Sequence, residues 1–192
     1  MKPVICALWI CVVCTSASVV GAEPKPVQVG DSIAAFNAND DQGNLWQSAT
    51  ALAKGKYLVV YFYPAALTGG CTTQACTYRD HTEDLAKLGI QIVGVSGDPV
   101  NNLKRFKQAH ALNFPLLSDV NGFIANRFGV PLRSGGVFET TLDNETVTLI
   151  RPTTASRWTF VLNDQGKVIY KDTQVNVQQD AVKVIAFIKG LD

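Results

Sequence analysis

The sequence has few of the residues from which metal and cofactor sites are built. It contains two histidines, one methionine and five cysteines in 192 residues, without the paired spacing of a zinc site. No glycine-rich phosphate loop or dinucleotide fingerprint occurs either. Acidic and basic residues nearly balance, so neither a nucleic-acid surface nor a patch for anionic membranes is indicated. We therefore predict no metal, no bound cofactor and no nucleic-acid partner.

An apolar stretch without charge lies at the N-terminus. Lys2 precedes 19 uncharged residues, 4–22, which end in small side chains. A short apolar core followed by small residues is typical of a secretory signal peptide. We therefore predict a signal peptide over residues 1–22 and export of the rest, to the periplasm, with no stable membrane association after cleavage. The alternative is an uncleaved membrane anchor, because about 20 apolar residues can span a bilayer.

Removal of the leader would leave few cysteines. Cys6, Cys11 and Cys14 lie within it, so Cys71 and Cys76 remain in the exported chain. An oxidising compartment would then hold one possible cysteine pair and no unpaired thiol. The remaining 23–192 segment is long enough for one well-packed domain and too short to expect two.

The apolar pattern alternates strands with helices from residue 57 onward. The expected elements are a strand over 57–63, a helix from about 68 to 88, a strand over 90–95, a helix ending before Pro115, a short helix over 121–128, an antiparallel hairpin over 157–170 and a terminal helix around 182–188. Asp98 is the expected N-cap of the second helix and Pro99 its first residue. A βαβ half followed by a ββα half predicts an α/β, thioredoxin-like fold with a central mixed sheet flanked by helices.

Two segments are less regular. Residues 27–56 have short apolar stretches around a turn-prone centre, which predicts a small hairpin and a short helix. Residues 131–156 combine glycines with a strand-like run over 146–150 and a turn at 143–144, and we expect a surface excursion there.

The remaining two cysteines lie where a strand gives way to a helix. Cys71 falls at the predicted helix start, where free N–H groups and the helix dipole favour the reactive thiolate. Cys76 follows five residues later, and Cα atoms at i and i+5 of a regular helix are roughly 8.6 Å apart. A disulfide needs about 7 Å or less. A bond between them therefore requires the helix start to unwind, although a buried thiol pair or a structural disulfide remains the simpler alternative.

The spacing of these residues resembles that of a known family. Pro64-x-x-x-Thr68-x-x-Cys71, with Cys76 after it and Arg157 opening a later strand, resembles the peroxiredoxins. The gap between the cysteines is similar to that of the peroxiredoxin Q, or bacterioferritin comigratory protein, branch. The resemblance runs from about residue 27 to the C-terminus.

The resemblance implies a role for each of these residues. Cys71 would be the peroxidatic nucleophile, oxidised to a sulfenic acid, and Cys76 the resolving cysteine that condenses with it. Thr68 would place its hydroxyl beside the sulfur and the peroxide oxygen. Arg157 would stabilise the thiolate and the charge that develops on oxygen. Pro64 would shield the site and fix the loop.

The implied activity is that of a thiol-dependent peroxidase. Its substrates would be hydrogen peroxide and organic hydroperoxides, its reductant a thioredoxin-like protein, and its state a monomer. Two alternatives stay open on the same fold, namely an exported thiol-disulfide oxidoreductase and a non-enzymatic redox sensor. Arg151 is a rival to Arg157 for the arginine role, and Arg79 with Asp80 is expected to be a plain surface ion pair.

Overall fold

The computed structural model describes residues 26–142 and 144–191. Within that part, the centre of the fold is a mixed sheet of β3 (Tyr57–Phe62), β4 (Ile90–Ser96), β5 (Leu116–Ser118), β8 (Trp158–Asn163) and β9 (Val168–Asp172). The spatial order is β5-β4-β3-β8-β9. β3 pairs in parallel with β4 and antiparallel with β8, so the N-terminal end of β8 lies beside the C-terminal end of β3.

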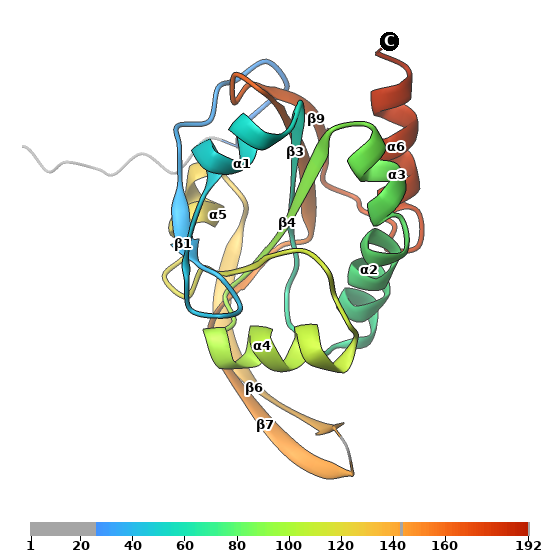
Figure 1. Cartoon of the computed structure of the whole chain (residues 1–192). Coiled ribbons are helices and arrows are strands. Elements are labelled where there is room, and N and C mark those ends of the chain that lie inside the picture. The colour runs from blue at the N-terminus through green and yellow to red at the C-terminus, as the bar shows by residue number, and fades with distance from the viewer. Residues whose placement is uncertain (1–25, 143, 192) are drawn as a thin grey trace, which may run out of the picture.

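Side chains of β3 are buried on both faces of this sheet. Val59 and Tyr61 belong to one core, and Leu58 and Val60 to the other. The first core packs under α2 (Gly69–Asp80), α3 (Thr82–Lys87), α4 (Val100–Ala109) and α6 (Asp180–Lys189), the second under α1 (Ser48–Lys54) and α5 (Phe123–Arg127). Figure 1 shows α2, α3 and α6 on one side of the sheet and α1 and α5 on the other. Burial on both faces explains why this strand is a continuous apolar run.

The predicted mixed sheet flanked by helices is confirmed. The N-terminal segment also forms the expected small hairpin and short helix, as β1 (Asn37–Asn39), β2 (Leu45–Gln47) and α1. The predicted hairpin near the C-terminus is β8 and β9, joined by a turn in which Gly166 has a positive φ of 73°.

The single helix predicted from about 68 to 88 is wrong, because the segment forms two helices. α2 ends at Asp80 and α3 begins at Thr82, with His81 between them. The Thr82 hydroxyl hydrogen-bonds to the carbonyl oxygens of Tyr78 and Arg79 at 3.1 and 2.8 Å. Such side-chain bonding competes with the regular backbone pattern, and it coincides with the break.

The predicted start of α4 is also wrong. Pro99 is the N-cap and Val100 the first helical residue. Asp98 does not cap the helix, because its carboxylate is used elsewhere. It accepts hydrogen bonds from the Ala66 N–H at 2.8 Å and from the Ser96 hydroxyl at 3.0 Å. The residue that looked like a cap therefore ties the end of β4 to the loop after β3.

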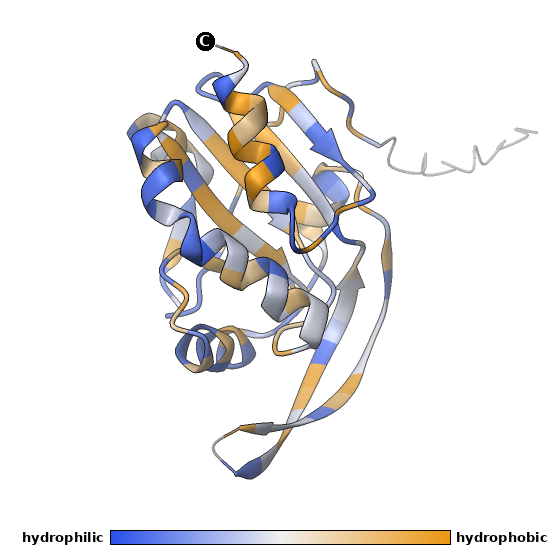
Figure 2. Ribbon diagram, turned by 90° about the vertical axis from the view of Figure 1, so that its right-hand side faces the viewer, coloured by the Kyte–Doolittle hydropathy of each residue, from blue (hydrophilic) through white to orange (hydrophobic). Residues whose placement is uncertain are grey.

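The expected surface excursion is a long, regular hairpin of β6 (Leu132–Leu142) and β7 (Glu145–Ala155). It projects from the body of the protein, beyond α4 (Figures 1 and 2). Leu149 is fully buried, and Phe138 packs against the same core. At the base of the hairpin, the Ser156 N–H donates to the Pro131 carbonyl at 2.9 Å, so the chain leaves and rejoins the body at one place.

The predicted signal peptide, residues 1–22, lies outside the described residues. Within 26–142 and 144–191, no helix has the length and apolar character needed to cross a bilayer. Cleavage of the leader and the single-domain boundary at residue 23 therefore stay predictions.

Candidate active site

Cys71 is the third residue of α2, directly after the loop that leaves β3. Its side chain is 2% exposed, and it lies in the first turn of the helix, where N–H groups have no intrahelical partner. The loop before it contains Leu67 in a left-handed conformation, with φ of 62°. Non-glycine residues avoid this region unless the surroundings enforce it. The Asp98 carboxylate that binds the Ala66 N–H supplies one such constraint.

Arg157 reaches the sulfur of Cys71 from the neighbouring strand. Because Phe62 pairs with Trp158, Arg157 stands beside the point where β3 ends and the cysteine loop begins. Its Nη2 lies 3.2 Å from Cys71 Sγ, and its Nη1 donates to Gln74 Oε1 at 2.5 Å. A guanidinium at this distance stabilises a thiolate more than a neutral thiol.

Arg151, the rival arginine, has a different neighbour. Its Nε lies 3.5 Å from Asp98 Oδ1, and its side chain is 10% exposed. Among the described residues, Arg157 is the one arginine that hydrogen-bonds to the Cys71 sulfur. The structure therefore brings Arg157 to Cys71, and Arg151 to the carboxylate that holds the loop.

Thr68 and Pro64 frame the cysteine loop. Thr68 is the N-cap of α2, but its hydroxyl makes no capping bond and instead donates to the Ala65 carbonyl at 2.9 Å. The expected place of that hydroxyl beside the sulfur stays a prediction. Pro64 is half-buried and follows β3 after one residue, Tyr63, where a proline ends the strand without leaving an unpaired N–H.

Comparison with known proteins identifies the family of this site. Residues 29–171 match the AhpC/TSA family. The chain belongs to that family. It is 34% identical over 155 residues to a putative peroxiredoxin of Mycobacterium tuberculosis, covering 81% of this chain and 90% of that protein. It is also 40% identical over 106 residues to peroxiredoxin Bcp of Escherichia coli, covering 55% of this chain and 67% of that protein.

Solved structures agree with this assignment. Peroxidoxin BcpB of M. tuberculosis has a TM-score of 0.71 at 31% identity, covering 85% of this chain and 97% of its own. Peroxiredoxin Q of Xanthomonas campestris has a TM-score of 0.64 at 28% identity, covering 81% and 90%. The predicted peroxiredoxin Q/Bcp branch and thioredoxin-like fold are confirmed, and the protein is a thiol-dependent peroxidase of this family.

Cys76 lies on α2, the helix that also carries Cys71, and its side chain is half-buried. Both cysteines are free thiols, separated by more than one turn of α2. Arg79 lies one turn further on, and proximity to Asp80 and to Cys76 raises the pKa of its guanidinium. It forms the expected ion pair with Asp80 at 2.8 Å, and it also donates to the His110 carbonyl at 2.6 Å, which joins α2 to the end of α4.

A buried polar network behind the two cysteines was not predicted from the sequence. Asp180, at the start of α6, accepts hydrogen bonds from Gln74, Tyr78 and Thr159 at 2.7, 2.8 and 2.8 Å. All four residues are fully buried. Burial raises the pKa of the Asp180 carboxyl, and the three donors lower it in part. Asp180 shares the apolar stripe of Val184 and Ile188, and a carboxylate on such a stripe was the available signal.

Aromatic rings cover the network on the side of β3. Tyr61 stacks between Tyr63 and Tyr78, with ring centroids 5.5 and 4.9 Å away. Burial, followed by the nearby Cys71 and Asp180, raises the pKa of the Tyr61 phenol well above its ordinary value. These phenols therefore stay neutral beside the site, and they keep water away from it.

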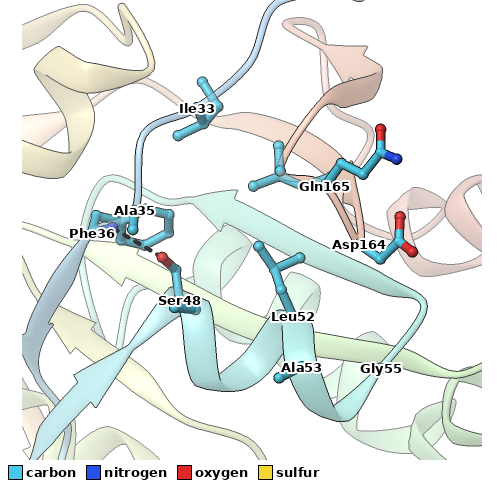
Figure 3. Close-up of a pocket in the computed structure, with 12 residues that line it drawn as sticks. Ile33, Ala35, Phe36, Ser48, Leu52, Ala53, Gly55, Asp164 and Gln165 are labelled. Carbon is cyan, nitrogen blue, oxygen red and sulfur yellow. Dashed lines mark hydrogen bonds between the residues drawn. The ribbon is translucent and has the colours of Figure 1, made fainter.

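A cavity of about 590 Å³ lies at the other end of the sheet. Figure 3 shows Phe36, Ser48 and Leu52 on one side of it and Asp164 and Gln165 on the other. It is next to Gly55, which precedes β3, whereas Cys71 follows β3. None of the five predicted site residues lines it, so this cavity is not the place of the thiol chemistry.

Proposed function

We propose that this peroxidase reduces hydrogen peroxide and organic hydroperoxides with Cys71 as its nucleophile. The observation that carries the proposal is the 3.2 Å contact between Arg157 Nη2 and the Cys71 sulfur at a helix start. A solved relative, the bacterioferritin comigratory protein of X. campestris, is described as having alkyl peroxide reduction activity. That description supports the same substrate class here.

In the first step, the Cys71 thiolate donates an electron pair to the terminal oxygen of the peroxide. The O–O bond breaks, the sulfur becomes a sulfenic acid, and the other oxygen leaves as water or an alcohol after taking a proton. Arg157 stabilises the thiolate beforehand and the oxygen that gains negative charge as the bond breaks. Thr68 places its hydroxyl beside the sulfur and the peroxide oxygen, and Pro64 shields the site and fixes the loop.

In the second step, Cys76 resolves the sulfenic acid. Its sulfur bonds to that of Cys71, and the hydroxyl group leaves as water with a proton from the Cys76 thiol. The positions five residues apart on α2 are too distant for a disulfide, so α2 must unwind around them. A dithiol donor of the thioredoxin type then reduces the disulfide and is itself oxidised.

Variants of the two cysteines test this division of labour. Cys71→Ser should abolish peroxide consumption. Cys76→Ser should still form one sulfenic acid per chain, detected by intact mass after trapping, but should fail to turn over with a dithiol donor. Equal loss of the first oxidation in both variants would contradict the assignment.

The two alternative activities differ in what they consume. A peroxidase uses peroxide in the presence of a dithiol, an oxidoreductase reduces insulin disulfides without peroxide, and a sensor does neither at a useful rate. Steady-state peroxide reduction by residues 23–192 with several thiol donors therefore decides among them, and sedimentation of the same sample tests the proposed monomer.

Export and the cleaved leader are also part of the proposal. The apolar 4–22 stretch and its small-residue end support it. Intact-mass measurement of the exported protein should give a chain that begins near Glu23. Full-length chain retained in the membrane fraction would instead indicate an anchor.

A further inference from the structure

The network behind Cys71 connects α6 to the sulfur through two side chains. Asp180 Oδ2 accepts from Gln74 Nε2 at 2.7 Å, and Gln74 Oε1 accepts from Arg157 Nη1 at 2.5 Å. Arg157 Nη2 then contacts Cys71 Sγ at 3.2 Å. Gln74 donates to Asp180 through its NH2 group and accepts from Arg157 through its oxygen. The hydrogen bonds therefore run in one order, from the Asp180 carboxylate through Gln74 and Arg157 to the Cys71 sulfur.

We infer that Asp180 is a positioning residue for Arg157, acting through the Gln74 amide; this rests on the proposed role of Cys71. The amide of Gln74 has a donor end and an acceptor end. An ionised carboxylate accepts hydrogen bonds and cannot donate them. Asp180 therefore holds the NH2 end of the Gln74 amide toward α6. The acceptor end is thereby turned toward Arg157, and the guanidinium is held with its second nitrogen on the sulfur.

Burial makes this orientation stable. Asp180, Gln74, Tyr78 and Thr159 are each 0% exposed, so water does not compete for their hydrogen bonds. Tyr78 and Thr159 supply two further donors to the same Oδ2 oxygen, which holds the carboxylate in place. A buried amide without that acceptor would lose a partner that it cannot replace locally.

Positioning and simple charge effects predict opposite shifts. Removal of a negative charge near a thiol, by itself, favours the thiolate and lowers the midpoint of its titration. Release of Arg157 disfavours the thiolate and raises the midpoint. The sign of the shift in a variant therefore distinguishes the two effects.

Titratable and charged groups from several elements face Asp180. They are Tyr78 on α2, Tyr61 on β3, and Tyr170 and Asp172 on β9, whereas Arg157 is joined to Asp180 through Gln74. Burial raises the pKa of each of these three phenols, so they stay neutral where a thiolate titrates. Asp172 pairs with Lys183 at 3.7 Å.

The test compares two changes at Asp180 in residues 23–192 that carry Cys76→Ser, where Cys71 is the one remaining cysteine and ultraviolet absorbance reports its thiolate. Asp180→Ala removes the acceptor and should raise the titration midpoint by roughly 0.5 to 1 pH unit, the equivalent of one hydrogen bond. Asp180→Asn can place its amide oxygen at the Oδ2 position, where it accepts from Gln74, and its NH2 at the buried Oδ1 position, which has no hydrogen-bond partner among the described residues. It should titrate within about 0.3 unit of the parent or slightly below it.

Controls separate this effect from loss of stability. Asp119 is a buried carboxylate on the other face of the sheet, where it accepts the N–H groups of Ile124 and Ala125 at 3.0 and 2.8 Å. Asp119→Ala should destabilise the protein and leave the thiolate midpoint unchanged. Gln74→Met breaks the connection at its centre and should raise the midpoint as Asp180→Ala does. In an Arg157→Ala background, Asp180→Ala should add no further rise.

Several results would overturn the inference. Equal midpoints for Asp180→Ala and Asp180→Asn would do so, as would a rise that persists without Arg157 or a similar rise in Asp119→Ala. If Asp180→Ala does not fold, Asp180→Ser replaces it, since its side chain is too short to reach Gln74, and an unchanged midpoint there overturns the idea. Absence of peroxide consumption by the parent protein would instead refute the proposed function, which the titration does not measure.

Discussion

Replacement of Arg157 by alanine should weaken both the thiolate and its reaction with peroxide. The guanidinium is 3.2 Å from the Cys71 sulfur, and a hydrogen bond to a charged group contributes about 1.5–3 kcal/mol. One pH unit of titration corresponds to about 1.36 kcal/mol. Arg157 is half-buried, so solvent screening favours the lower part of this range. We expect the midpoint of the Cys71 titration to rise by about 1–1.5 pH units.

The rate of the first oxidation should fall further than the thiolate population. Removal of one preorganised donor to a developing oxygen anion costs about 10²–10³ in rate, and that loss adds to the reduced ionisation at neutral pH. Stopped-flow oxidation of the Cys76→Ser protein, followed at several pH values, separates the two contributions. At high pH, where Cys71 is ionised in both proteins, the remaining difference is the effect on the transition state.

Arg151→Ala is the matched control, because it removes the same side chain from a neighbouring position. Arg151 faces Asp98 rather than Cys71, so its loss should affect stability and shift the thiolate titration little. Arg157→Lys should recover part of the shift, since it keeps the charge but loses the contact to Gln74. A larger shift in Arg151→Ala than in Arg157→Ala would refute the reasoning.

Three further predictions concern the whole protein. Amide hydrogen exchange of the disulfide form should show protection lost over about residues 69–79 and kept in β3, and equal protection of both forms would mean that α2 does not unwind. Gly94→Ala should lower the free energy of unfolding by about 1–3 kcal/mol in urea titrations, because a Cβ there would lie 2.7 Å from the Tyr61 ring. Burial raises the Asp180 pKa above the ordinary 3.8, so its ionisation opposes folding as pH rises through the window above 3.8. The free energy of unfolding of Asp180→Asn, measured relative to that of the parent, should therefore increase as the pH rises above about 4. An increase of this difference toward acid pH would contradict the raised pKa of Asp180.

The fold was largely predictable because its strongest signals are local. The continuous apolar run of β3, the glycine turn between β8 and β9 and the apolar stripe of α6 each fit within a few residues. The break at His81 and the start of α4 were not predictable in this way. Both involve side chains with partners far away in the sequence, because the Thr82 hydroxyl also donates to Asn113 Oδ1 at 2.9 Å and Asp98 accepts from the Ala66 N–H. The long hairpin was missed in part because its glycines weaken the strand pattern.

The site was predictable where residues share a loop or a recognisable spacing, as with Pro64, Thr68 and Cys71. Asp180 was missed because its contact with Gln74 joins positions 106 residues apart. The position of Asp180 on the apolar stripe of α6 does not indicate its partner, and only the packing of α6 against α2 brings the two residues together. Sequence spacing thus pointed to the candidate reacting groups, whereas the buried contacts behind them became visible only in the fold.

The way in which the β6–β7 hairpin is attached has an evolutionary consequence. The backbones of Pro131 and Ser156 are hydrogen-bonded to each other at the base of the hairpin. Lengthening or shortening the two strands beyond this base therefore leaves the positions of α5 and β8 unchanged. Beyond Phe138 and Leu149, which pack against the core, residues can therefore be gained or lost in pairs, one from each strand, without changing where the two strands join the domain. Homologues should differ in length at this position more than at any loop around Cys71, and a chimaera that exchanges only residues 139–148 should still fold.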